Sequence, residues 1–169
     1  MIFKATLDKT AKLLTIGITI LFIGIVIGPK LIVKTEITEI PILLSVIIFL
    51  TYGISYALSP KSYELNKTNL IIKRPFNNVT LNRSEIKNIL KLENGKLTWS
   101  IRTFGVGGLF GYFGKFWSKE FGSMTWYATR RDKAIMIVTK ENKKIVLTPD
   151  EVEKFINEFT AIENQQPNG

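Results

Sequence analysis

The chain has 169 residues, 46% of them hydrophobic, and its 23 Lys and Arg against 14 Asp and Glu give a formal net charge of +9. This length accommodates one ordinary domain with a modest extension. Because the chain contains neither cysteine nor histidine, disulfide frameworks, thiolate zinc sites, iron–sulfur clusters and catalytic sites built on either residue are excluded.

Two long apolar runs occupy the N-terminal third of the chain. Residues 13–28 and 40–58 contain no charged residue, and about 20 apolar residues in a helix cross the hydrocarbon layer of a bilayer. One alternative is a buried helix pair, but the rest of the chain is too short to cover it on every side. A cleavable signal peptide is the other, but no small-x-small cleavage site follows the first run. We therefore predict two transmembrane helices, about 12–33 and 40–58, within an N-terminal segment 1–58.

The charges that flank the two runs predict an orientation. Three lysines precede the first run, four basic residues follow the second within residues 61–74, and the connector between the runs has no net charge. Basic residues accumulate on the cytoplasmic side of a membrane. The sequence thus predicts a multi-pass membrane protein with both termini cytoplasmic and the connector 34–39 outside.

Residues 59–163 are predicted to form a cytoplasmic β-rich domain, followed by a disordered tail at 164–169. Short β-type runs alternate with turn residues here, and Asn94-Gly95 is a type I′ hairpin signal because both residues tolerate positive φ. The pattern indicates seven or eight strands. They are expected at residues 62–65, 69–74, 79–81, 86–92, 97–104, 123–130, 134–140 and 144–147.

The last predicted element is an amphipathic helix. Thr148-Pro149-Asp150-Glu151 has the pattern of a capping box with Thr148 as the N-cap. Strands in a row followed by one such helix predict a small β-sandwich or partly open barrel that the helix plugs. The apolar face of the helix is expected to contain Val152, Phe155, Ile156 and Phe159.

Residues 104–121 are rich in glycine and aromatic side chains. Nucleotide binding is disfavoured because Gly114-Lys115 is followed by phenylalanine and no βαβ unit surrounds it. Two interpretations stay open. The segment is either a long connection between strands, with glycines at positive φ and rings partly buried, or a surface that contacts a membrane or a partner. In the second case the interface residues are Phe110, Phe113, Phe116, Trp117, Lys115 and Lys119.

The run from Ile86 to Phe159 resembles the bacterial pleckstrin-homology-like (PH-like) domain family, which occurs in small membrane proteins with two N-terminal spans. The resemblance lies in the motifs GGLFGYFGKF (107–116), WYAT (126–129), IMIV (135–138) and KIVLTPDE (144–151), followed by Phe155. It implies a seven-stranded β-barrel with a C-terminal capping helix, and it does not imply a catalytic activity. Together with the predicted spans, it implies a location in the bacterial inner (cell) membrane. Eukaryotic relatives bind lipids through basic residues in the first hairpin loop, where this chain has Lys67, Lys73 and Arg74 as candidate contacts to anionic lipid.

No catalytic, cofactor-binding or metal-binding residue is assigned from the sequence. Asp150, Glu151 and Glu153 fall in the first turn of the last helix, where the helix dipole accounts for them. Residues 59–169 contain 18 basic and 11 acidic residues, an excess that fits either solvated charge or attraction to an anionic membrane surface. Nucleic acid is disfavoured as a partner because the lysines are not gathered in a reading motif.

The predicted fold class is an α+β membrane protein: a transmembrane helical hairpin, then a PH-like β-barrel or sandwich of about seven strands with a C-terminal capping helix. The predicted function is a membrane-anchored, non-catalytic interaction or scaffolding module without a cofactor. Beyond the lipid bilayer itself, its expected partners are a protein, its own copies or anionic lipid headgroups at the cytoplasmic face. The alternative is an accessory subunit of a membrane transport or enzyme complex.

Overall fold

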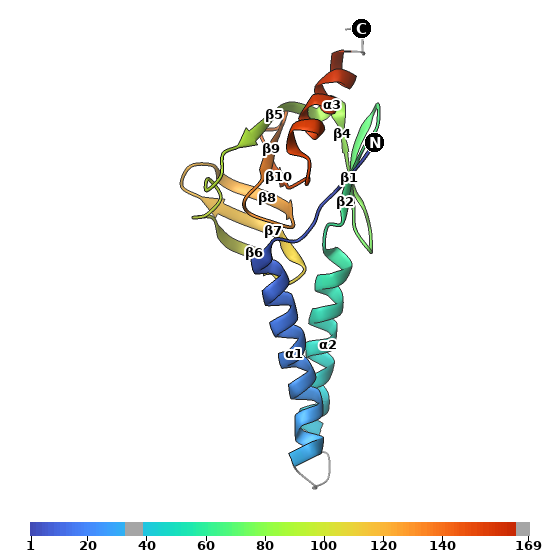
Figure 1. The fold of residues 1–169 in the computed structure, drawn as a ribbon, viewed down its shortest axis with the longest axis vertical. Helices are drawn as coiled ribbons and strands as arrows, with labels where there is room; N and C mark the ends of the chain where they lie inside the picture. Colours follow the sequence, from blue (N-terminus) through green and yellow to red (C-terminus); the bar gives the residue numbers. More distant parts are fainter. Residues whose placement is uncertain (33–38, 165–169) are drawn as a thin grey trace.

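The computed structural model describes residues 1–32 and 39–164, and it consists of two long helices attached to a two-sheet β domain (Figure 1). Helices α1 (Lys9–Ile32) and α2 (Glu39–Leu58) run side by side and project from the domain. Residues 34–38 of the expected outside connector and 165–169 of the expected tail lie outside the described residues.

The predicted transmembrane hairpin is wrong. Among the described residues, no helix combines the length and the apolar character that a membrane crossing requires. The fold class is therefore α+β without a transmembrane hairpin. The predicted multi-pass localisation in the inner membrane is wrong for the same reason, and so is the orientation derived from the flanking charges.

Ten strands form two sheets within the described part of the chain. Sheet A has the order β1-β2-β3-β4 and sheet B the order β5-β9-β10-β8-β7-β6. All neighbouring strands are antiparallel except β8 and β10, which are parallel. The strands are β1 (Ile2–Lys4), β2 (Ser62–Leu65), β3 (Asn69–Lys73), β4 (Val79–Asn82), β5 (Ile86–Leu92), β6 (Ile101–Gly108), β7 (Gly111–Ser118), β8 (Gly122–Ala128), β9 (Ala134–Thr139) and β10 (Lys144–Leu147).

One predicted hairpin does not form. Asn94 and Gly95 lie in a turn, and Gly95 has a φ of 91°. The turn continues to residue 99, however, so that the next strand begins at Ile101 instead of Leu97. As a result β5 pairs with β9, and β6 pairs with β7. Leu97 itself is buried in the core on one side of sheet B.

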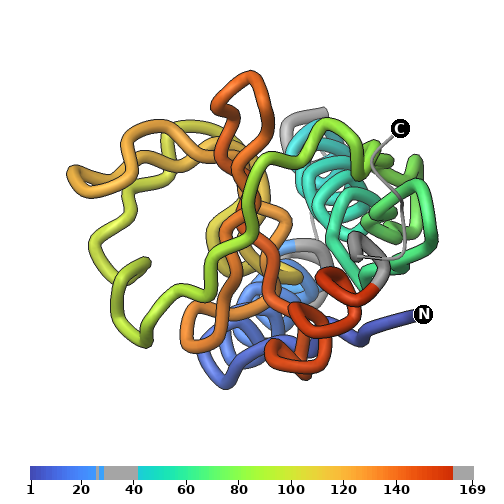
Figure 2. Tube along the Cα trace, turned by 90° about the horizontal axis from the view of Figure 1, so that it is seen from above, coloured from blue at the N-terminus to red at the C-terminus, as the bar shows by residue number. Residues whose placement is uncertain are grey.

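The main core lies between the two sheets and under α3 (Val152–Asn164). Seen along the helical pair, β2–β4 lie on one side, and the β6–β8 strands extend away on the other (Figure 2). The predicted apolar face of α3 is confirmed, because Val152, Phe155 and Phe159 are buried and Ile156 packs against the same core. Phe155 contacts the ring of Phe3, with centroids 4.9 Å apart.

Strand β1 has no counterpart in the sequence prediction. It precedes α1, yet it pairs with β2, which follows α2, in the register Ile2↔Glu64 to Lys4↔Ser62. Its central residue Phe3 is only 1% exposed. The start of α1 and the end of α2 are therefore held at the same sheet.

The expected capping box is also absent. Helix α3 begins at Val152, where the N–H of Phe155 donates to the carbonyl of Glu151. Thr148 is fully buried instead, and its Oγ1 accepts a hydrogen bond of 2.8 Å from the N–H of Thr129. The N–H of Thr148 donates to Oη of Tyr63 (3.0 Å), which in turn donates to the carbonyl of Tyr127 (2.6 Å). The threonine hydroxyl is thus used to join β8 to the end of β10.

Replacing Thr148 tests this role. Thr148→Ala should lower the free energy of unfolding by about 1–3 kcal/mol, because the buried N–H of Thr129 loses its acceptor. Thr148→Ser keeps the hydroxyl and should cost less than half as much. Urea unfolding of the full chain measures both values, and equal losses for the two variants would contradict the assignment.

Tyr63 predicts a specific alkaline sensitivity. Burial raises the pKa of Tyr63 from 10.0 to about 12, so the folded state retains a proton that the unfolded state releases. Its contribution to stability is complete below about pH 10 and is lost as the pH rises towards about 12. Urea unfolding between about pH 9 and 11.5 should show this fall. The fall should be shallower in Tyr63→Phe but not in Tyr56→Phe, which removes an exposed hydroxyl.

Candidate functional site

The glycine- and aromatic-rich segment lies in the β6–β7 hairpin. One expectation was a long connection between strands, but most of the segment is itself strand. Gly105 and Gly114 face each other across the pair, with φ values of 103° and 119°. A Cβ on Gly105 would lie 2.3 Å from the carbonyl oxygen of Phe113. These values confirm the expected positive φ angles. Glycine is required at both positions because a side chain would prevent the two backbones from approaching this closely.

The tip of this hairpin docks on both helices. The N–H of Phe110 donates to Oγ1 of Thr15 in α1 (2.9 Å). The Phe110 ring makes edge contacts with two α2 tyrosines, its centroid lying 4.9 Å from that of Tyr52 and 5.3 Å from that of Tyr56. Phe110, predicted as an interface residue, is therefore placed in an interface within its own chain.

The other predicted interface residues alternate between core and surface along β7. Phe116 is fully buried and stacks on Trp126 with centroids 4.1 Å apart, and Phe113 is 5% exposed. Trp117 is 46% exposed, and both lysines, Lys115 in β7 and Lys119 in the turn after it, are exposed. Phe116 faces the core on one side of sheet B, whereas Phe113, Lys115 and Trp117 lie on the opposite face, where exposure increases from Phe113 to Trp117.

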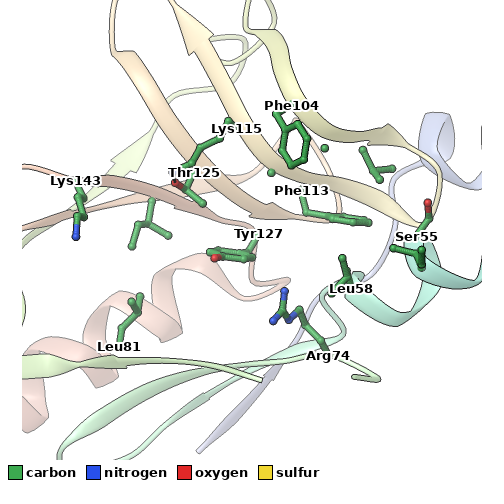
Figure 3. Close-up of a pocket in the computed structure, with 15 residues that line it drawn as sticks. Ser55, Leu58, Arg74, Leu81, Phe104, Phe113, Lys115, Thr125, Tyr127 and Lys143 are labelled. Atoms are coloured by element: carbon green, nitrogen blue, oxygen red, sulfur yellow. Dashed lines mark hydrogen bonds between the residues drawn. The ribbon is translucent and has the colours of Figure 1, made fainter. Parts of the chain in front are cut away.

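A cleft of about 740 Å³ opens between the inner face of sheet B and the edge of sheet A (Figure 3). It exists because β6, β7 and β8 continue sheet B on a side where sheet A ends at β4. The last turns of α2 form one wall. The cleft is lined by Ile54, Ser55, Leu58, Arg74, Leu81, Phe104, Gly105, Val106, Phe113, Gly114, Lys115, Thr125, Tyr127, Lys143 and Ile145.

Three lining residues are cationic and none is acidic. Nε of Arg74 donates to the carbonyl of Asn77 (2.8 Å), and its guanidinium carbon lies 5.9 Å from the centre of the Tyr127 ring. Nζ of Lys115 donates to Oγ1 of Thr125 (2.8 Å). Arg74 and Lys115 are thus held by neutral groups, and their charges add to a positive field in the cleft.

The third cation, Lys143, is partly neutralised. Its Nζ lies 2.6 Å from the carboxylate of Glu141, and this contact raises the pKa of Lys143 and lowers the pKa of Glu141. Both side chains are more than 70% exposed, so the pair adds little to stability.

The three basic residues that the resemblance indicated as lipid contacts have different surroundings. Only Arg74 lines the cleft. Lys73 forms an ion pair of 2.8 Å with Glu64, which lowers the pKa of that carboxyl. Lys67 is exposed in the β2–β3 turn. The cleft therefore brings together Arg74 from this set with Phe113 and Lys115 from the predicted interface set.

Sequence reasoning missed the cleft as a site, although part of the signal is present. Phe113, Lys115 and Trp117 share one face of β7, as the period of two predicts, and Thr125 and Tyr127 share one face of β8. The absence of sheet A from that region follows from strand pairing, which single-strand patterns do not encode. Among the described residues, no group of three acidic side chains is arranged to hold a metal ion.

The comparison with known protein families identifies the β domain. The sequence model of the bacterial PH domain matches residues 61–161, which extend from the residue before β2 into α3 and leave out β1 and both long helices. The chain therefore belongs to the bacterial PH domain family, as the sequence resemblance predicted. No curated protein and no solved structure matches the chain.

Phe110 offers a test of how the hairpin tip holds the helices. Phe110→Ala should lower the free energy of unfolding by about 2 kcal/mol through loss of both ring contacts. Phe110→Gly should cost about 1 kcal/mol less, because Phe110 has a φ of 57° and a left-handed backbone is unfavourable for residues with a Cβ. Amide hydrogen exchange should increase in the last turns of α2 in both variants. Phe76→Ala, which removes an exposed ring, is the control, and equal exchange in all three would contradict the docking role.

Proposed function

We propose that this bacterial PH domain is a non-catalytic interaction module that binds a protein by addition of a strand to β6. The proposal is carried by the position of β6, which is the last strand of sheet B and has β7 as its one hydrogen-bonded strand neighbour in the described structure. An edge strand presents unpaired N–H and C=O groups to any strand that approaches it.

The side chains around this edge favour pairing. Ile101 is 64% exposed, and its cross-strand neighbour Trp117 is 46% exposed. Trp99, just before the strand, is 88% exposed. Natural edge strands are commonly protected by charged residues, proline or bulges. Strand β6 contains Arg102 as its single charged residue and no proline, and its one irregularity is a register shift between Arg102 and Phe104. A contiguous apolar edge of this kind is typical of an interaction site.

A second copy of the chain is the partner that this edge fits best. Antiparallel pairing of two β6 strands places the same apolar side chains of both copies against one another, as a two-fold interface requires. An accessory role in a larger complex would use the same edge for a strand of another protein. Membership of the bacterial PH family supports the non-catalytic part of the proposal.

The association state of the full chain tests the proposal. A mild nonionic detergent keeps the exposed apolar side chains of α1 and α2 covered, and light scattering after size exclusion gives the mass. We expect a dimer, and a Trp99→Lys/Ile101→Lys double variant that associates at least about tenfold more weakly. Leu90→Lys on β5, at the opposite edge of the same sheet, is the matched control.

Two results would overturn this function. The first is a wild-type chain that stays monomeric at every concentration and binds no other protein more strongly than the double variant does. The second is a dimer that the double variant leaves unchanged while Leu90→Lys weakens it.

A further inference from the structure

The cleft between the sheets has the size and form of a small-molecule site. Its volume of about 740 Å³ lies within the range of about 300–1,000 Å³ that is usual for such sites. Its walls come from separate parts of the fold, which are α2, the end of β3, β4, β6–β8 and β10. A ligand in it would contact both sheets at once.

The walls are mainly apolar. Ile54 and Leu58 project from α2, Leu81 from β4, and Phe104, Val106 and Phe113 from the β6–β7 hairpin. Phe104 is 77% exposed, so a large apolar ring stands at the rim with its surface in water. Covering such surface with methylene groups is favourable in proportion to the area removed from water.

The charge of the cleft is one-sided. Arg74 and Lys115 approach it from opposite sheets, and no lining residue is acidic. Nε and Nη2 of Arg74 both donate to the carbonyl of Asn77, so the guanidinium group has further N–H donors for another acceptor. An anion at Arg74 would therefore gain charge-assisted hydrogen bonds without displacing an ion pair, and the charge of Lys115 adds to the positive field that it meets.

We propose that the cleft binds an amphiphilic anion, with an alkyl chain along its apolar walls and a carboxylate or phosphate head at Arg74, within the positive field to which Lys115 contributes. The ligand needs both the alkyl chain and the anionic head. An uncharged apolar molecule would leave the cations without a counter-charge, and a small anion would leave the apolar walls exposed to water. The proposal does not rest on strand addition, which uses the outer edge of β6.

Equilibrium dialysis of the full chain tests it, with the apolar helices kept in solution by an amphipathic polymer. The probes are decanoate and decyl phosphate, which differ in headgroup and show which of the two is preferred. Decanol, decyltrimethylammonium and inorganic phosphate are the controls for head charge and tail. We expect saturable one-to-one binding of decanoate or decyl phosphate, and binding at least about tenfold weaker for each control.

Variants locate the binding in the cleft. Arg74→Gln/Lys115→Gln should weaken decanoate binding at least about tenfold. Val106→Trp, which fills the cleft without a charge change, should weaken it similarly. Lys119→Gln/Lys133→Gln removes the same charge from exposed positions outside the cleft and should leave binding unchanged.

A measurement on the wild-type chain keeps the test independent of variant folding. With ¹³C-labelled isoleucine methyl groups, decanoate should shift the resonances of Ile54 and Ile145 and leave Ile2 unaffected. Equal binding of decanol and decanoate, methyl shifts confined to residues outside the cleft, or full binding by the folded Arg74→Gln/Lys115→Gln variant would each overturn the proposal. The Trp99→Lys/Ile101→Lys variant should still bind decanoate, so failure of strand addition and failure of the cleft are distinguishable.

Discussion

The pairing of β1 with β2 is the constraint on which the rest of the molecule depends. It brings together the two ends of the helical pair, since β1 precedes α1 and β2 follows α2. Asp8 reinforces the junction, because its Oδ1 accepts from the N–H of Ala11 (2.7 Å) and its Oδ2 from the N–H of Arg131 (3.2 Å). The first bond caps α1, and the second ties that helix to sheet B. With both helix bases fixed, the end of α2 becomes a wall of the cleft.

Local patterns predicted the elements whose structure depends on local chemistry. The limits of β2, β5 and β10 follow from alternation and turn residues, and the buried face of α3 from helical spacing. Features set by distant partners were not predictable in this way. Thr148 has the sequence context of an N-cap, yet its hydroxyl serves Thr129, 19 residues away. The apolar runs of α1 and α2 predicted helices correctly, but the inference from those runs to a membrane span was wrong.

The candidate site shows the same limit. Phe113 and Lys115 were identified from composition, and Arg74 from the family resemblance, but nothing local indicates that they share a cleft. Their proximity results from the unequal width of the two sheets, which leaves the inner face of β6–β8 uncovered. The glycine pair Gly105 and Gly114 makes this extension possible, because it permits the close backbone approach within the hairpin.

The register of β1 on β2 also has a mechanical consequence. Lys4 pairs with Ser62, so the ends of the two strands that continue into the helices lie at the same end of the ladder. A force that draws α1 and α2 away together loads both strands in parallel and shears β2 against β3. A force that spreads the helices apart acts instead at the Lys4–Ser62 end and opens the ladder one hydrogen bond at a time. The domain is therefore stiff towards a joint pull on its helices and compliant towards their separation, which would withdraw Ala5 and then Phe3 from the core.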